Sequence, residues 1–542
     1  MSEYNNTRSQ IKLPILLSLA LACGVFIGAV FFDNSGKSDI KSAYKKFADV
    51  LSYVDKDYVD TVDLESLVDY SISSMLEKLD PHTVYIPKAD IQVAHSQLEG
   101  DFEGIGIEFN IIKDTIIVVA PISGGPSEKA GLMAGDKIIK VNDSLVAGKT
   151  ISNADVFTLL RGKKGSEVKL SVKRGGQKKL LDHVVIRDKI PTYSIEIAYM
   201  VDASTGYIKV SRFSATTYQE FYEALKKLKK SGLQNLILDL RDNPGGYMDR
   251  ATNMADEFLS GNKLIVYTDG KDNKYDQKIY ANKTGLFEDG ALIVLLNEGS
   301  ASASEIVAGA VQDNDRALII GRRSFGKGLV QMPITLKDNS ELRLTISRYY
   351  TPSGRCIQKP YDGDAMTDYN SDLLKRYQHG EFFHADSIKM NDSLKYTTIN
   401  GRTVYGGGGI MPDIFVPRDT SAFTNYLVEI FNKNIIREFT LNYYSSNKEK
   451  LETMDIESYK SNFEVSEKML NEVVNMSTAA GVKFRPKEYN KSKEYLKTNI
   501  KAYIARSIWG NDGFYPILNA SDEDFIQAMK HIGEAKKMVG KK

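Results

Sequence analysis

Ser302 and Lys327 are the two residues whose types and surroundings point most directly to chemistry. Ser302 lies in the segment GSASASEI, between an apolar run predicted to be a buried strand and a segment predicted to be a helix. A serine in such a turn lies against the free N–H groups of a helix N-terminus, which can stabilise a developing oxyanion. The alternative is a capping serine, because Ser302 and Glu305 match the capping-box pattern.

Lys327 lies between two glycines, shortly after the apolar run ALIIG. Such a lysine usually ends a turn in solvent, but a lysine buried among apolar groups loses its proton and can act as a base. Of the six histidines, His183 is the nearest before this region in sequence and His379 the nearest after it. A Ser-Lys pair is a known variant of the Ser-His-Asp arrangement. A histidine brought close by folding stays open as an alternative.

Two glycine-rich turns are candidates for binding a ligand. Residues 321–327, GRRSFGK, match a phosphate loop, but Gly328 stands where the magnesium-binding Ser or Thr is required. The next segment is predicted to be a strand, whereas a phosphate loop opens a helix, so we do not expect nucleotide binding. The turn LRDNPGG (240–246) closes an apolar strand, and its paired glycines can expose N–H groups to a ligand. A plain tight turn is the alternative.

The composition is that of an ordinary folded chain of several domains, with 542 residues, 42% of them hydrophobic and 26% charged. Lysine plus arginine (71) nearly cancels aspartate plus glutamate (70), so we expect no nucleic-acid partner. Two cysteines, one of them within an apolar run, provide no disulfide framework. No zinc-binding motif is present, and we expect neither a metal nor an organic cofactor.

The N-terminus contains an uncharged run, residues 13–32, about long enough to cross a bilayer. Basic residues precede the run and Asp33 follows it, so the positive-inside bias predicts a cytoplasmic tail (1–12) and a periplasmic remainder. A cleaved signal peptide is the alternative, but the run is long for one and lacks a clear A-x-A exit. We therefore expect a single-pass inner-membrane protein anchored by residues 13–32.

Four regions are predicted after this segment. Residues 33–98 are helical, with apolar positions at three- and four-residue spacing. Residues 99–187 form a β-rich module with one helix. Residues 188–418 alternate apolar strands with helices, which is typical of an α/β core with parallel strands; this region ends in a paired β extension and a polar insertion near 360–400. Residues 419–542 are helical and charged, and we predict no chemistry there.

Several motifs in a fixed order make the chain similar to the carboxyl-terminal processing (tail-specific) serine peptidases over about residues 40–417. The motifs are LDPHTVYIP (79–87), FEGIGIEF (102–109), GPSEKAGLMAGDKIIKVND (125–143), LRDNPGG (240–246), GSASASEI (299–306), FGKGLVQ (325–331), YYTPSGRCIQ (349–358) and GGGGIMPDIFVP (406–417). The resemblance implies a multidomain α+β fold. It would comprise an α/β crotonase/ClpP-like protease core with an inserted β-rich PDZ domain, N-terminal helices and a helical C-terminal region.

The resemblance also implies roles for single residues. The family nucleophile matches Ser302, its base matches Lys327, and Gln331 matches the residue that orients this lysine by a hydrogen bond. The remaining matches have less direct roles: Ala303 and either Gly245 or Gly246 would donate their N–H groups to the oxyanion, Asp313 would be structural, and Cys356 would pack without reacting.

The β-rich module resembles a PDZ domain, with Gly104, Ile105, Gly106 and Ile107 matching the carboxylate-binding loop. PDZ domains add an extended peptide to a sheet edge and capture its terminal carboxylate. Arg161 matches an arginine that in some relatives links PDZ occupancy to the active site. The implied function is a serine-type endopeptidase that binds accessible C-terminal tails of proteins and cleaves them through an acyl-enzyme. A second copy of the chain or an adaptor protein stays open as a further partner.

Two functions of other classes also stay open. A membrane-tethered PDZ adaptor with a degenerate protease domain would share every motif outside the Ser-Lys pair, and a serine-reactive covalent probe would reveal it by failing to react. A crotonase-like acyl-CoA enzyme would fit the α/β core and the glycine turn but leaves the PDZ module unexplained; acyl-CoA turnover would reveal it.

Overall fold

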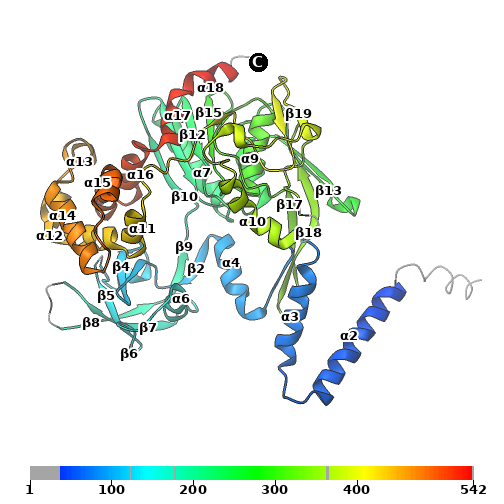
Figure 1. Cartoon of the computed structure of the whole chain (residues 1–542), viewed down its shortest axis with the longest axis horizontal. Helices are drawn as coiled ribbons and strands as arrows, with labels where there is room; N and C mark the ends of the chain where they lie inside the picture. The colour runs from blue at the N-terminus through cyan, green and yellow to red at the C-terminus, as the bar shows by residue number, and fades with distance from the viewer. Residues whose placement is uncertain are drawn as a thin grey trace, which may run out of the picture. The chain divides into compact units, whose positions relative to one another are not determined.

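The computed structural model describes residues 37–122, 124–133, 135–175, 177, 179–361 and 365–539. The chain divides into two units, Met1–Leu79 and Asp80–Lys542. In the first unit, α2 (Lys37–Asp57) and α3 (Leu64–Leu76) are helices, drawn in dark blue in Figure 1. Asp63 caps α3, because its carboxylate accepts from the N–H groups of Glu65 and Ser66. Both helices lie within the region predicted to be helical.

The predicted membrane location needs correction. The predicted anchor, residues 13–32, lies outside the described residues, and across the part of the chain that the structure describes no helix is both long and apolar enough to cross a bilayer. The physical reason is charge: α15 (Pro486–Trp509) has the required length, yet lysines and glutamates recur along it. This finding contradicts the prediction of a single-pass inner-membrane protein, and we withdraw that prediction.

The second unit is built around a six-stranded sheet. In spatial order its strands are β10 (Ile195–Met200), β11 (Thr205–Val210), β12 (Asn235–Asp239), β15 (Ala291–Leu296), β16 (Leu318–Gly321) and β21 (Ile414–Phe415). β10 runs antiparallel to β11, and every other neighbouring pair is parallel. The carboxyl ends of β12, β15 and β16 therefore meet at one edge, where ligands of open α/β sheets bind.

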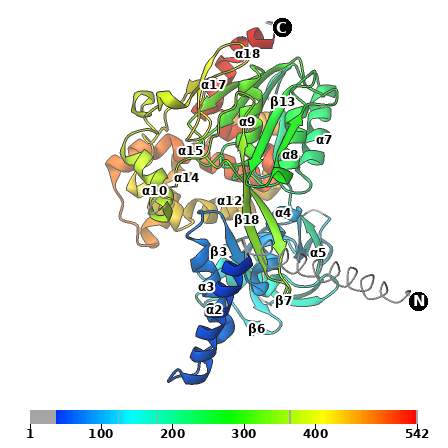
Figure 2. The same ribbon diagram turned by 90° about the vertical axis from the view of Figure 1, so that its right-hand side faces the viewer.

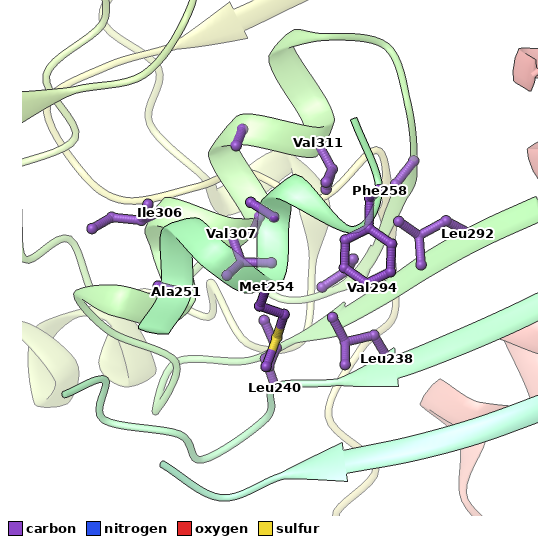
Figure 3. Close-up of a cluster of buried hydrophobic side chains, with 14 of the residues drawn as sticks. Leu238, Leu240, Ala251, Met254, Phe258, Leu292, Val294, Ile306, Val307 and Val311 are labelled. Atoms are coloured by element: carbon purple, nitrogen blue, oxygen red, sulfur yellow. The ribbon is translucent and has the colours of Figure 1, made fainter. Parts of the chain in front are cut away.

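Helices cover both faces of this sheet, which explains why β15 is apolar throughout and why β12 is apolar between Asn235 and Asp239. On one face α7 (Thr217–Lys230), α8 (Met248–Asp256) and α9 (Ala303–Asp313) lie over the strands. Figure 3 shows Met254 and Val307, from α8 and α9, over the strand residues Leu238 and Val294. Successive residues of β15 alternate between the two apolar clusters, as the two-residue period of a strand requires.

The other face is covered by the end of the chain. α17 (Glu523–Lys530) and α18 (Ile532–Val539), drawn in red in Figure 1, pack on β15, and α17 also packs on β16. Their buried residues Phe525, Ala528 and Ala535 join a cluster with Ile237 and Ile293 of the sheet. Figure 2 shows the same two helices from a second direction. These helices lie in the region predicted to be a separate C-terminal part, yet they complete the α/β core.

A second sheet carries the predicted β extension. β17 (Leu329–Thr335) pairs antiparallel with β18 (Glu341–Tyr350), as predicted. β18 also pairs with β1 (Val84–Ile86) and β13 (Leu264–Gly270), and β13 pairs with β14 (Gln277–Tyr280). The polar insertion predicted near 360–400 contains a helix, α10 (Ala365–Gln378).

The β-rich module is a six-stranded antiparallel sheet. Its strands are β3 (Ile107–Ile112), β4 (Thr115–Pro121), β5 (Lys137–Val141), β6 (Ser144–Leu145), β7 (Glu167–Lys173) and β8 (Leu181–Ile186). Two helices, α5 (Pro126–Lys129) and α6 (Asn153–Leu160), belong to the same module. β2 (Asp101–Gly104) pairs with β9 (Asp188–Pro191) where the module's chain enters and leaves.

The C-terminal region has an apolar core of its own. Its helices are α11 (Asn425–Asn432), α12 (Ile435–Glu452), α13 (Ile456–Asn462), α14 (Glu467–Ala479), α15 and α16 (Asn511–Asn519). This part of the chain is helical, as predicted.

Candidate active site

Ser302 occupies a sharp turn between β15 and α9. It is the residue just before the helix, and its backbone angles are φ 55° and ψ −111°. A side chain other than glycine is strained at such angles, and strain of this kind persists where the surroundings over-determine it. In α/β-hydrolases, a strand–turn–helix arrangement of this kind holds the nucleophilic serine against a helix N-terminus.

The buried carboxylate of Glu305 connects the Ser302 turn to the Lys327 loop. Its Oε2 accepts from the Ser302 N–H at 2.7 Å and from the Lys327 N–H at 2.9 Å. Its Oε1 accepts from the Ser324 hydroxyl at 2.5 Å and from the Gly326 N–H at 2.7 Å. Burial raises the pKa of Glu305 to about 7, although all these hydrogen bonds act to lower it. Glu305 therefore binds the Lys327 loop as well as Ser302, its partner in the capping-box pattern.

Tyr349, on β18, makes a second connection between the same two residues. Its fully buried hydroxyl oxygen lies 3.1 Å from the carbonyl oxygen of Ser302 and 2.7 Å from that of Lys327. One O–H is therefore shared between two acceptors. Burial raises the pKa of Tyr349 well above its ordinary value, so the phenol keeps the proton that it donates.

The side chain of Lys327 is half-buried and lies beside β17. Its Nζ donates to Oε1 of Gln331 at 2.9 Å, and Nε2 of Gln331 donates in turn to the carbonyl oxygen of His82. Burial lowers the pKa of Lys327, the nearby Arg343 lowers it further, and Asp80 and Glu305 oppose the shift. The predicted contact between Lys327 and Gln331 is present, whereas no hydrogen bond joins Lys327 Nζ to Ser302 Oγ among the described residues.

The turn after β12 approaches Ser302 closely. A Cβ added to Gly245, whose φ is 99°, would lie 2.8 Å from the Cβ of Ser302 and 2.9 Å from the nitrogen of Ala303. The N–H of Gly245 already donates to the side chain of Asn243 at 2.9 Å. Within the described part of the chain, the N–H groups of Gly246 and Ala303 have no acceptor. The geometry therefore favours Gly246 over Gly245 as the partner of Ala303 in binding an anion.

Polar residues that the sequence did not single out hold these two turns together. The carbonyl oxygen of Asn243 accepts from the Ala301 N–H at 2.9 Å and from the Ser304 hydroxyl at 3.0 Å. The Ser300 hydroxyl donates to the carbonyl oxygen of Leu240 at 2.8 Å. The two outer serines of SASASE are thus used in hydrogen bonds to the neighbouring turn, whereas the middle serine, Ser302, faces the glycine turn.

One histidine is brought near this site by folding. His82, on the segment before β1, shares a hydrogen bond of 2.6 Å with the hydroxyl of Tyr369 on α10. Burial, together with the charge of Lys327, lowers the pKa of His82 to about 4, so this imidazole is neutral at neutral pH. His82 lies in the motif LDPHTVYIP (79–87), but sequence spacing did not indicate this placement, because more than two hundred residues separate His82 from Lys327.

In the β-rich module, residues 104–107 run from the end of β2 to the start of β3. Within the described part of the chain, the N–H groups of Ile105 and Gly106 have no acceptor, while the carbonyl oxygen of Ile105 accepts from Ser127. Neighbouring free N–H groups of this kind are suited to a terminal carboxylate. Carboxylate binding by this loop stays a prediction.

Arg161, at the end of α6, lies next to this loop. Its guanidinium carbon lies 4.8 Å from the ring centre of Phe102 and 4.6 Å from that of Phe157. Its Nη1 donates to the Ser96 hydroxyl at 3.3 Å, and its Nε is buried without a partner among the described residues. Burial lowers the pKa of Arg161.

Asp313 and Cys356 are the two remaining residues that were named from the sequence. Asp313 forms a fully buried ion pair with Arg355 at 2.7 Å and accepts from the Ser353 hydroxyl at 2.6 Å. The thiol of Cys356 is partly buried, and burial raises its pKa. Among the described residues, no group of three or more His, Cys, Asp or Glu side chains could hold a metal ion.

Family comparisons agree with this architecture. The family model described as peptidase family S41 matches residues 204–365, and the model described as PDZ domain matches residues 104–184. A family of unknown function (DUF8443) matches residues 426–510. The fold and site therefore define a PDZ-containing peptidase of the S41 type.

Individual relatives point the same way. A "Carboxy-terminal-processing protease" of Bartonella bacilliformis is 38% identical over 408 residues, covering 73% of this chain and 91% of the relative. The "Carboxy-terminal processing protease CtpB" of Bacillus subtilis is 35% identical over 325 residues, covering 59% and 67%. A solved structure titled photosystem II D1 C-terminal processing protease is 29% identical and covers 56% of this chain and 81% of that one, with a TM-score of 0.33, which by itself supports no argument. The chain belongs to the family of carboxy-terminal processing proteases and is a serine peptidase.

Proposed function

We propose that this peptidase cleaves proteins with accessible C-terminal tails, using Ser302 as nucleophile and Lys327 as general base. The observation that carries the proposal is the shared attachment of both residues to Glu305, with Ser302 in a strained turn at a helix N-terminus. A nucleophile and its base must keep a set distance for proton transfer, and one carboxylate oxygen that binds both backbones supplies such a constraint.

In the proposed reaction, neutral Lys327 takes the proton from Ser302 Oγ as this oxygen attacks the carbonyl carbon of the scissile bond. The carbonyl oxygen becomes an oxyanion and accepts from the N–H groups of Ala303 and Gly246. The intermediate collapses to an acyl-enzyme, and the leaving amine takes the proton from Lys327. Water, deprotonated by the same lysine, then releases the acyl group. Burial of Lys327 supports the neutral form that this sequence of steps needs.

The proton transfer requires Lys327 Nζ to reach Ser302 Oγ, and in this structure Nζ donates to Gln331. Catalytic hydrogen bonds are often long or misaligned in a free enzyme and tighten when the substrate binds. Gln331, on β17, donates in turn to the carbonyl oxygen of His82, which fixes the Gln331 side chain. The side chain of Lys327 therefore also has a fixed position before it moves toward Ser302.

We further propose that the substrate tail binds to the PDZ domain, with its terminal carboxylate on the N–H groups of Ile105 and Gly106 and its chain beside β3. Apolar groups around this loop support a tail with apolar residues. The domain then presents the preceding part of the substrate to the catalytic turns.

The test is cleavage of a protein with a disordered apolar C-terminal tail, followed by mass spectrometry. Ser302→Ala and Lys327→Met should each abolish cleavage, while both variants keep the thermal unfolding midpoint within a few degrees. Ser231→Ala is the control, because this exposed serine at the end of α7 donates only locally, to the Lys227 carbonyl oxygen. Cleavage at the normal rate by either Ser302→Ala or Lys327→Met would disprove the assignment.

A further inference from the structure

Two aspartates at the start of α17 contact the catalytic strands. Nη1 of Arg241 donates to both carboxylate oxygens of Asp522 at 2.9 Å and to Asp524 at 3.0 Å. The same guanidinium donates to Asp239, at the end of β12, at 2.6 Å. Asp522 and Asp524 belong to neither the residues matched by the S41 model nor those matched by the family of unknown function.

Arg241 is well placed to control the proposed oxyanion site. It directly follows the last residues of β12 and belongs to the turn that contains Gly246. Its side chain is only 11% exposed, so its hydrogen bonds face little competition from water. Burial would raise the pKa of Asp239, but the charges of Arg241 and Lys209 outweigh burial and hold this pKa well below its ordinary range.

A second arginine extends the contact to the other two catalytic loops. Nη1 of Arg322 donates to Asp524 at 3.2 Å, and its Nε donates to Glu298 at 2.9 Å. Arg322 directly follows β16 and leads to the Lys327 loop, while Glu298 follows β15 and leads to Ser302. Two aspartates of one helix start therefore connect the ends of all three strands from which the site is built.

The attachment of α17 to the sheet does not depend on these charges alone. Phe525 is buried against Tyr207, with ring centres 5.5 Å apart, and Ala528 is fully buried in the same cluster. Removing a charge from Asp522 or Asp524 thus leaves an apolar contact that keeps the helix in place. Charge loss and helix detachment can be separated by experiment.

We propose that Asp522 and Asp524 are positioning residues for peptide cleavage, which they support by holding Arg241 and Arg322, and through them the oxyanion turn and the Lys327 loop, in register with Ser302. This inference rests on the proposed function. It assigns a catalytic purpose to the end of the chain, for which the sequence predicted no chemistry. A displacement of about 1 Å at such a site can cost about a hundredfold in rate, so loss of the contact should be measurable.

The test compares Asp522→Asn and Asp524→Asn in the full-length protein. Asparagine at position 522 still caps α17, because its side-chain oxygen can accept from the Phe525 N–H as the aspartate does. For a fluorogenic peptide with an apolar C-terminal tail, we expect kcat to fall at least tenfold with KM unchanged, since tail binding lies in the PDZ domain. Reaction of Ser302 with a fluorophosphonate probe should slow to the same extent.

Glu523→Gln is the matched control, since it removes one charge from the same turn of α17 but from an exposed side chain, which accepts a hydrogen bond from Gln527. It should leave kcat, KM and the probe rate unchanged. Arg241→Lys should itself lower kcat, and adding Asp522→Asn to it should cost little more, because both substitutions break the same contact.

Three results would overturn the inference: normal kcat in the Asp522→Asn/Asp524→Asn double variant, additive losses with Arg241→Lys, or a loss of activity that matches the fraction of unfolded protein. These outcomes are distinguishable from failure of the proposed function, which would appear as cleavage by Ser302→Ala. If Ser302→Ala is inactive and the double variant is normal, only the positioning role of the two aspartates is wrong.

Discussion

Ser302 and Lys327 are connected through both polar groups of their backbones: their N–H groups donate to one oxygen of Glu305, and their carbonyl oxygens accept from the hydroxyl of Tyr349. Neither connection uses the reactive side chains. The hydroxyl and the amine therefore stay available for chemistry while the distance between their backbones is constrained. This relationship is the basis of the first two predictions.

Glu305→Gln should lower kcat by at least tenfold, because an amide nitrogen would face N–H groups that need an acceptor. KM for a tail peptide should not change, because the substituted side chain lies away from the PDZ domain. Steady-state kinetics measure both constants. Equal rates for Glu305→Gln and the wild-type protein would show that the connection does not control the site.

Glu305→Gln should also change how the free energy of unfolding depends on pH. The pKa of Glu305 is about 7 in the folded protein and 4.5 as its ordinary value, so between these pH values the folded state binds more protons. The contribution of Glu305 to the free energy of unfolding is therefore largest below pH 4.5 and declines as the pH rises through 7. Relative to Glu305→Gln, the wild-type protein should lose about 3 kcal/mol over this range, measured by urea unfolding. A constant difference between the two proteins would contradict the raised pKa.

Tyr349→Phe should remove the hydrogen bond shared by the two carbonyl groups. The Lys327 carbonyl then loses its buried donor, whereas the Ser302 carbonyl keeps the N–H groups of Glu305 and Ile306. We expect a destabilisation of about 1–3 kcal/mol and a lower kcat. Tyr350→Phe is the control on the same strand, because its neighbour Tyr267 stacks on its ring, which phenylalanine preserves. If both variants lose the same activity, the effect belongs to the strand and not to the Tyr349 hydroxyl.

The rate of cleavage should rise with pH as Lys327 loses its proton, with a midpoint below the ordinary value of 10.5 because burial lowers this pKa. Two substitutions should move the midpoint in opposite directions. Arg343→Met removes a positive charge and should move it to higher pH; Asp80→Asn removes a negative charge and should move it to lower pH. Profiles of kcat/KM against pH measure these shifts, and shifts of the same sign would exclude Lys327 as the titrating base.

Gly245→Ala should abolish probe labelling of Ser302. The added methyl group would lie 2.8 Å from the Ala301 carbonyl oxygen and from the Ser302 Cβ, and the φ of 99° is itself unfavourable for alanine. Binding of a tail peptide to the PDZ domain, measured by fluorescence anisotropy, should be unchanged. Normal labelling would mean that the turn can move away from Ser302 without loss of the site.

Much of this arrangement follows from local sequence. Apolar strands alternating with helices predicted the α/β core, because strands buried on both faces must be apolar throughout. The motifs around Ser302 and Lys327 named the candidate pair. Glu305 was visible only as a capping residue, since a capping pattern carries no information about contacts with the Lys327 loop. Tyr349 and His82 gave no signal as parts of the site, because their roles arise from chain segments brought together by the tertiary fold.

The C-terminal end shows a second limit of sequence analysis. The apolar positions of α17 indicate that one face is buried, but periodicity does not say against which surface. In the structure, the apolar face of α17 packs on the six-stranded sheet of the protease core. The contact of Asp522 with Arg241 follows from that packing. The membrane prediction failed for a different reason: it rested on residues 13–32, and in the part of the chain that the structure describes no helix meets the same criterion.

The packing of α17 and α18 on the protease sheet has a consequence for biosynthesis. Strands β12, β15 and β16 leave the ribosome long before residues 523–539. One apolar face of the sheet therefore stays exposed until α17 and α18 have been synthesised. If Asp522 and Asp524 position the three loops as proposed, the loops reach their final arrangement only after α17 has been synthesised and has packed on the sheet. A nascent chain that does not yet include α17 would then be unable to cut itself or its neighbours.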